Sequence, residues 1–294
     1  MKKLADNRRQ VEYSYVFDSP DFPLAIKMEE NAGSIASHLH DNFSELVIVQ
    51  KGRAIHHVAN RKYQLTAGDI FVIGENQMHS YSDTENFCYC NVLMDFKTLN
   101  LPLEDLPTRA GYQTLFVIDS RDTAPDRFRN RFRLNPEQLE ITYKMLKNIE
   151  SQIPSKRFEA IANFMLLISF LCDCCGNELK STDIIPFRLG NIAAKMEKHC
   201  EENFPIDEMC RLSCMSRATL FRYFRMYYGV SPIEYLIRLR VNKSMQFLRN
   251  TSLSCGAIAI ECGFTDASYF AMHFKRINGI TPKEYRNSLQ KIIE

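Results

Sequence analysis

A twelve-residue pattern occurs twice near the C-terminus, and it constrains the fold of this chain more than any other feature. FRMYYGVSPIEY covers residues 224–235, and FKRINGITPKEY covers residues 274–285. Their aromatic, basic, Gly, Pro, Glu and Tyr positions coincide at a constant offset of 50 residues. A repeated sequence indicates a repeated structural unit, so two copies of one motif are predicted.

Length and charge divide the chain further. Its 294 residues exceed what one compact core usually holds, which favours two domains. From Pro186 onward there are 16 Lys and Arg against 10 Asp and Glu, whereas the remaining residues carry 21 against 25. This asymmetry predicts an anionic partner for the C-terminal part alone.

The sequence predicts a cytoplasmic protein without a membrane partner. MKKLADNRRQVEYSY, at the N-terminus, lacks the apolar core of a secretory signal. The apolar run at 164–175 is too short to span a bilayer and contains Asp173. In the cytoplasm, the 10 cysteines are expected to be reduced and mostly buried thiols.

Short apolar segments followed by helical periodicity predict an α+β fold. ELVIVQ, YQLTAGDIFVIG and NFCYCNVLMDF are typical of strands, so residues 24 to about 120 are predicted to form an antiparallel β-barrel or sandwich. Leu139, Tyr143, Leu146 and Ile149 share one face of a helix that starts at Pro136, and a second, apolar helix covers 158–171. The predicted domains are 1–130, a barrel with an N-terminal arm; 131–178, a helical packing or dimerisation segment; 179–186, a linker; and 187–294, an all-α domain.

The repeated motif reads as a helix-turn-helix. After a first helix at 189–202, a short helix at 206–213 and a turn lead to Ser216, a good N-cap, and the next helix ends at Gly229. Asp266 is the corresponding cap in the second copy. The helix between the units, from Pro232, spans about 18 residues or roughly 27 Å, close to the ~34 Å of one duplex turn. One chain could therefore enter two successive major grooves.

Both copies bury two apolar residues and expose the other side of their second helix. Leu220 and Phe224, and Phe270 and Phe274, are predicted to face inward. An exposed helical hairpin need not bind anything, but duplication, spacing and positive charge together favour DNA. Arg217 and Arg225 could contact phosphate alone. The predicted DNA-binding residues are Arg217, Ala218, Thr219, Phe221, Arg222, Arg225, Ala267, Ser268, Ala271, Met272 and Lys275.

About 100 C-terminal residues resemble the AraC/XylS family of transcriptional regulators. The resemblance lies in SRATLFRYFR, GVSPIEYLIRLRVNKSMQFL, IAIECGFTDASYFAMHFKR and GITPKEYR. It implies a double helix-turn-helix fold, promoter binding and base-facing positions at Ala218, Phe221, Arg222, Ala267, Ser268, Ala271 and Met272. Met272 departs from the family, which often has a basic residue there, so Arg222 is the expected main base reader.

The N-terminal half resembles a cupin, which in this family commonly serves as the effector-binding domain. GSIASHLHDNFSELVIVQKG and AGDIFVIGENQMHSY place His38, His40, Glu45 and His79 at the motif positions, with departures at Gly74 and Asn76. The resemblance implies that these four side chains bind an organic effector or a divalent metal such as Fe, Mn, Ni or Zn. No cofactor is expected, and a metal stays the alternative. His56 and His57 are expected on the strand surface.

The expected function is a DNA-binding regulator, not an enzyme, controlled by a small ligand. A sugar is favoured because HLHDNFSELVIVQKG looks like the rhamnose-type sensors of the family. The predicted partners are promoter DNA, the effector, RNA polymerase and a second copy bound through 136–175. A metal-dependent cupin enzyme or metal sensor with an appended DNA-binding module is the main alternative. An architectural DNA protein is another, whereas a DNA-alkylation repair protein would need a Pro-Cys-His-Arg type motif that does not occur.

Overall fold

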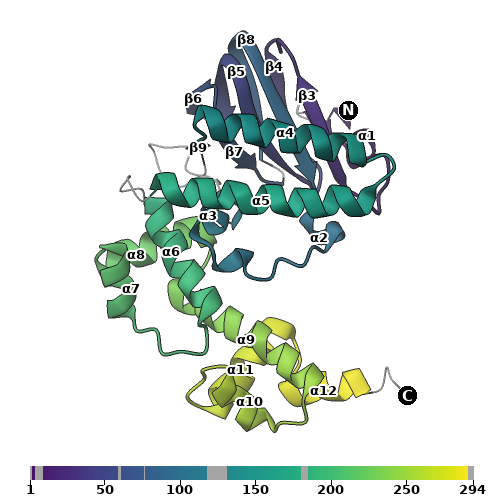
Figure 1. Ribbon diagram of the computed structural model, residues 1–294. Coiled ribbons are helices and arrows are strands. Elements are labelled where there is room, and N and C mark those ends of the chain that lie inside the picture. The colour runs from purple at the N-terminus through teal and green to yellow at the C-terminus, as the bar shows by residue number, and fades with distance from the viewer. Residues whose placement is uncertain are drawn as a thin grey trace. The chain divides into compact units, whose positions relative to one another are not determined.

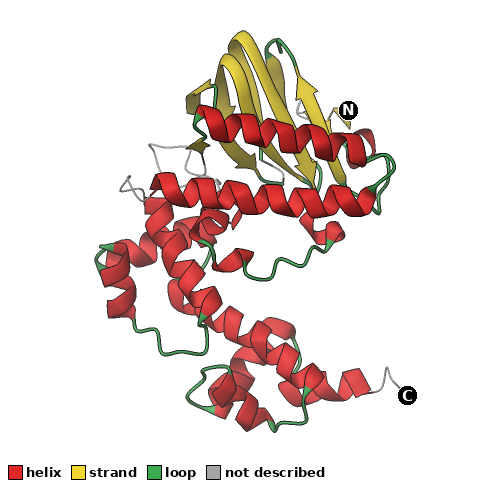
Figure 2. Ribbon diagram, viewed as in Figure 1, coloured by secondary structure: helices red, strands yellow, loops and turns green. Residues whose placement is uncertain are grey.

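The computed structural model describes residues 2–3, 9–58, 61–75, 77–117, 131–179 and 185–290. The chain divides into two compact units, Met1–Phe187 and Arg188–Glu294. All described strands belong to the first unit, and the second unit is helical (Figure 2). The predicted α+β class with two domains is thus confirmed, while the centre of the predicted linker, residues 180–184, lies outside the described residues.

The first unit is built on one mixed sheet. Its strands are β1 (Lys2–Lys3), β2 (Arg9–Val11), β3 (Leu24–Glu29), β4 (Ile35–His40), β5 (Ser44–Val58), β6 (Arg61–Thr66), β7 (Asp69–Ile73), β8 (His79–Met94) and β9 (Phe132–Arg133). The order is β1-β2-β4-β8-β5-β7-β9, with β3 also paired to β8 and β6 to β5. The prediction of an antiparallel barrel or sandwich needs two corrections: β2 pairs with β4 in parallel, and no pairing among the described strands joins β9 to β1 to close a barrel.

Helices begin earlier than the sequence predicted. α1 (Tyr13–Val16) follows β2, and after β8 the chain forms α2 (Phe96–Leu99), a 3-10 turn at Leu106–Thr108, α3 (Ala110–Tyr112) and a π turn at Gln113–Val117. The expectation of strands up to residue 120 is therefore wrong beyond Met94. Asp95 is the local reason, because its carboxylate accepts the backbone N–H groups of Lys97 and Thr98 and so caps a helix.

Two long helices, α4 (Pro136–Gln152) and α5 (Arg157–Leu179), lie side by side, and α4 crosses one face of the sheet (Figure 1). A reciprocal capping box between Asn135 and Gln138 starts α4. The buried side chains of α4 and α5 share one core with Leu46 and Ile48 of β5, and the Tyr143 hydroxyl donates to the Ile48 carbonyl oxygen at 3.0 Å. These helices leave the opposite face of the sheet free to form a site.

Helix α5 runs further than predicted and is strongly apolar. Its Arg157–Cys175 segment is long and apolar enough, by length and composition, to cross a membrane, which corrects the expectation drawn from 164–175 alone. Core helices of soluble proteins pass the same test, and Phe164, Leu167 and Ile168 are fully buried in the core between α5 and the sheet. The buried apolar side chains of α5 are therefore explained by packing in this core.

The second unit contains α6 (Ile185–Lys198), which begins in the first unit, α7 (Ile206–Ser213), α8 (Arg217–Tyr228), α9 (Pro232–Asn250), α10 (Cys255–Glu261), α11 (Ala267–Asn278) and α12 (Pro282–Gln290). α6 starts and ends four residues before its predicted bounds. The predicted caps are confirmed: the Ser216 and Asp266 side chains accept backbone N–H groups, and Gly229 ends α8 in the left-handed region. Leu220, Phe224, Phe270 and Phe274 are fully buried, as predicted.

Candidate functional site

The sheet face opposite the helices carries an aromatic and polar lining. Along β5, Ala54, His56 and Val58 are buried whereas the residues between them are half-exposed. This period of two places His56 on the inner face. Phe71 of β7 and Tyr81 of β8 lie on either side of its ring, with ring centroids 4.9 and 5.0 Å away.

The sheet register brings four predicted ligand-binding side chains together. His38 of β4 pairs directly with His79 of β8, and His40 lies two residues further along β4. Glu45 of β5 pairs with Leu93 of β8, and directly paired residues share a face of the sheet. This is the face that carries His40 and His79, because both imidazoles contact the Glu45 carboxyl. We call His38, His40, Glu45, His56, His79 and Tyr81 the polar cluster.

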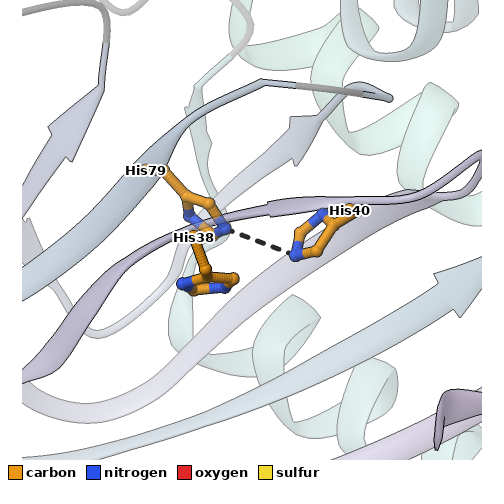
Figure 3. Close-up of side chains that lie close together, drawn as sticks. All are labelled: His38, His40 and His79. Carbon is orange, nitrogen blue, oxygen red and sulfur yellow. Dashed lines mark hydrogen bonds between the residues drawn. The ribbon is translucent and has the colours of Figure 1, made fainter. Parts of the chain in front are cut away.

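His38, His40 and His79, three members of the polar cluster, lie close together (Figure 3). The Nε2 atoms of His40 and His79 are 3.4 Å apart, and each is 3.5 Å from Glu45 Oε2. The rings of His38 and His79 are 4.3 Å apart, centroid to centroid. His38 is half-buried while the other members are buried, so it lies at the exposed edge of the cluster.

Burial keeps the polar cluster uncharged. It raises the pKa of the Glu45 carboxyl to about 8, and it lowers the pKa of His40 to about 3, with His38 adding a smaller effect. Burial likewise depresses the pKa of His79 well below its usual range. The contacts between Glu45 and the two imidazoles have the geometry of ion pairs, but desolvation disfavours the charged form of each partner. Near neutral pH they therefore join mostly neutral groups.

Several buried polar atoms in this region have no hydrogen-bond partner among the described residues. They are His40 Nδ1, Glu45 Oε2, His79 Nδ1 and the Tyr81 hydroxyl, and Asn91 Oδ1 joins them on the same face of β8. An unpaired buried polar group costs ~1–3 kcal/mol, so several together indicate a binding site for a polar molecule. Two hollows on the described surface, of about 480 and 650 Å³, are lined by other residues.

The polar cluster fits a divalent metal in part. One nitrogen from each of His38, His40 and His79 lies within 4.8 Å of the others, and imidazole and carboxylate donors suit Fe, Mn, Ni or Zn. Metal-binding imidazoles usually donate their second N–H to a fixed acceptor. His38 Nδ1 contacts the Ala36 carbonyl oxygen at 3.0 Å, but Nδ1 of His40 and of His79 lacks such a partner within the described ranges. The side chains themselves suit a metal, but, as far as the structure describes the chain, two of the three imidazoles lack the hydrogen-bond acceptor that usually orients a metal ligand.

A second group, His199, Glu201 and Glu202, also satisfies a simple distance test for metal binding. Lys243 Nζ contacts Glu201 Oε2 at 2.6 Å, and His199 contacts Glu202. Lys243 thus already pairs with one of the two carboxylates of this group, which lies apart from the buried polar cluster.

The expectation that His56 is a surface residue is wrong. Its side chain is fully buried in the polar cluster, whereas His57 is half-exposed and contacts the Ser82 hydroxyl at 2.7 Å. The prediction also missed Tyr81 and Asn91. The alternation of Ala54, His56 and Val58 along the strand could have predicted that His56 faces inward. Tyr81 and Asn91 could be assigned to this face only from the pairing of β8 with β5.

In the second unit, the exposed sides of α8 and α11 carry the predicted DNA-binding residues. Most are exposed, and Thr219, Phe221 and Ala271 are half-buried. The Arg222 guanidinium lies 4.8 Å from the centroid of the Tyr223 ring, and that of Arg217 lies 5.7 Å from the Phe221 ring. Such stacking limits the freedom of both arginines before any DNA is bound. Met272 is 55% exposed and presents a thioether where α8 presents Arg222.

Known proteins resemble both units. The model of the AraC-like ligand binding domain matches residues 25–165, and that of a helix-turn-helix domain matches residues 209–288. The HTH-type transcriptional activator RhaS of Enterobacter sp. (strain 638) is 28% identical, over 92% of this chain and 94% of that protein. The activator RhaR of Mannheimia succiniciproducens is 23% identical over 96% and 98%. The DNA-binding domain of AdpA, solved with a target DNA, is 30% identical over 35% of this chain and 94% of that domain, with a TM-score of 0.34.

A ligand-binding unit joined to two helix-turn-helix motifs defines a ligand-controlled, DNA-binding transcriptional regulator. One matched model lies within each of the two units. The chain belongs to the AraC family.

Proposed function

We propose that this chain is a cytoplasmic transcriptional activator, without enzymatic activity, that binds a sugar at the polar cluster. The unpartnered polar atoms of His40, Glu45, His79 and Tyr81 carry the proposal. Sugar hydroxyls both donate and accept hydrogen bonds, so they can satisfy imidazole, carboxyl and phenol groups together. The RhaS and RhaR relatives are named activators, so RNA polymerase is the expected partner at the promoter. Rhamnose is the first effector to test, because HLHDNFSELVIVQKG resembles the rhamnose-type sensors of the family.

Sugar binding changes DNA occupancy only if it favours one arrangement of the protein over another. The test is a titration of the protein onto the promoter fragment next to its gene, with and without rhamnose and a panel of other sugars. One sugar should change the apparent affinity. Unchanged binding with every sugar contradicts the effector, whereas absence of sequence-specific binding contradicts the regulator itself.

Replacing Tyr81 by Phe should weaken the sugar response. This substitution removes a buried hydroxyl that has no partner within the described part of the chain and keeps the ring beside His56. We expect the sugar concentration at half-response to rise about tenfold, since one hydrogen bond is worth ~1 kcal/mol or somewhat more. Tyr15→Phe, on the exposed surface of α1, is the control and should behave as wild type.

The metal alternative is tested on the same protein. Elemental analysis of purified protein should find less than one metal per chain, and a chelator should leave the sugar response intact. Stoichiometric metal that is lost in a His40→Ala variant, together with loss of DNA response on chelation, would replace the sugar by a metal as the effector.

We further propose that the protein is a homodimer through α4 and α5. Phe158 is 84% exposed and Leu166 is 61% exposed; Ala162 lies between them at helical spacing, and Ile141 of α4 is 37% exposed. Large exposed apolar side chains in a row indicate a contact surface.

Leu166→Ser should therefore raise the dimer dissociation constant at least tenfold, because burying a leucine contributes ~1.5–3 kcal/mol and the dimer carries the substitution twice. Leu253→Ser, an exposed leucine before α10, is the matched control. Sedimentation equilibrium measures both variants. A monomeric wild-type protein at all concentrations, or a Leu166→Ser dimer as tight as wild type, would disprove this interface.

A further inference from the structure

The two copies of the repeat use one glutamate in different ways. Glu234 and Glu284 occupy the same position, 50 residues apart, just after the proline that opens α9 or α12. In α12, Glu284 closes a capping box: Thr281 N donates to its carboxylate at 2.8 Å, and Glu284 N donates to Thr281 Oγ1 at 3.2 Å. Glu284 therefore acts within its own helix end.

Glu234 instead connects two helices. Ser231 Oγ still accepts Glu234 N–H at 3.2 Å, so the cap of α9 is kept. The Glu234 carboxylate, however, accepts Arg276 Nη2 at 2.6 and 2.8 Å and Arg238 Nε at 3.3 Å. Burial alone would raise the pKa of Glu234, but these hydrogen bonds, Arg276 first, hold it below its usual value. The carboxylate is thus ionised and paired with α11.

Arg276 is specific to the second copy. It lies in the last turn of α11, and the corresponding residue of α8 is Met226. Its guanidinium also contacts His273 Nδ1 at 3.1 Å, which fixes it against the buried side of α11. Glu234 follows Gly229, the end of α8, by five residues. The pair therefore links the end of α11 to the segment that directly follows α8.

Apolar packing alone does not fix the position and angle of α11 on α9. Phe270 and Phe274 of α11 pack with Ile237 and Val241 of α9, but such contacts are non-directional. A charged hydrogen-bond pair adds direction, because its strength depends on geometry. It therefore restricts how far α11 can turn or slide on α9.

We propose that Glu234, through Arg276, is a positioning residue that sets the spacing between the two DNA half-sites the chain accepts. The inference rests on the proposed function, and it requires that both helix-turn-helix units of one chain bind the same duplex at once. A fixed angle between α8 and α11 matches one separation of half-sites and disfavours others, because an added base pair moves the second half-site along and around the duplex.

Glu234→Gln tests the inference with duplexes that the wild-type protein selects from a randomised pool. Each selected duplex is compared with versions in which one base pair is inserted or removed between the half-sites. Wild type should bind the selected spacing best. Glu234→Gln should bind it about fivefold more weakly, since a partly exposed ion pair contributes ~1 kcal/mol at most. The distinguishing result concerns the ratio of affinities for the selected and the altered spacing. This ratio should be smaller for Glu234→Gln than for wild type.

Two further variants complete the design. Arg276→Met introduces the residue of the first copy, breaks the same pair from the other side, and should show the same reduced spacing preference even if Glu234→Gln folds poorly. Glu284→Gln removes the charge at the equivalent position of the second copy, where a glutamine can still accept the Thr281 N–H, and should keep the wild-type preference. Equal weakening at every spacing, or an unchanged preference in both pair variants, overturns the inference. If wild type itself selects no sequence, the proposed function fails instead.

Discussion

An Arg222→Ala variant is expected to lose ~1–3 kcal/mol of binding free energy on its operator and to relax sequence preference at one base position. Arg222 is exposed on α8, and its guanidinium lies over the Tyr223 ring. A guanidinium presents two parallel donors to guanine O6 and N7, which lysine cannot reproduce. Arg222→Lys should therefore recover affinity in part but not the base preference.

Titrations on selected duplexes, with each base of the half-site varied in turn, measure this effect. Met272→Ala is the matched control, since Met272 occupies the position of Arg222 in the second copy and carries no hydrogen-bond donor. It should change base preference little. An Arg222→Ala protein with the affinity and base preference of wild type would show that Arg222 is not the base reader.

Acid should destabilise the first unit, and His56 should account for about 2 kcal/mol of that loss near pH 5. Burial, more than the nearby charges of His57, Arg131 and His38, lowers the pKa of His56 to about 3. The unfolded chain, with an ordinary histidine pKa, binds the proton below about pH 6.5 while the folded chain does not. The contribution of His56 to the stability of the first unit is therefore complete above about pH 6.5. It falls by about 1.4 kcal/mol for each unit of acidification below that pH.

His56→Phe keeps a ring between Phe71 and Tyr81 and removes the titrating group. Its free energy of unfolding should thus fall less steeply with acid than that of wild type. Pulse proteolysis in urea, with fragments of the first unit quantified by mass spectrometry, measures this slope in the full chain. His57→Phe is the control at the half-exposed neighbouring position. Equal slopes for His56→Phe and wild type would contradict the prediction.

The opposite trend is expected from Glu45. Because burial raises the pKa of Glu45 to about 8, the folded state holds a proton that the unfolded state has lost, and stability declines as pH rises from about 4.5 towards 8. His40 and His79 act in the same direction as His56. The first unit should therefore be most stable near neutral pH when no ligand is bound.

Local signals in the sequence predicted the helical unit well. Ser216, Gly229 and Asp266 cap or stop helices through bonds to residues a few positions away, so their effect is readable without a structure. The internal repeat then fixed the number of helix-turn-helix units. In the first unit, the motif spacing of His38, His40, Glu45 and His79 predicted side chains that the sheet register does bring together.

What the sequence determined by itself is thus the set of short-range elements, their repetition, and the candidates for the polar cluster. Only the tertiary structure decided that the described sheet is open and mixed, that His56 and Tyr81 lie in the polar cluster, and that Glu234 pairs with Arg276 while Glu284 hydrogen-bonds within its own helix end. The physical reason is distance along the chain. Each of these outcomes depends on strand register or helix packing between residues far apart in sequence, and local propensities do not encode such pairings.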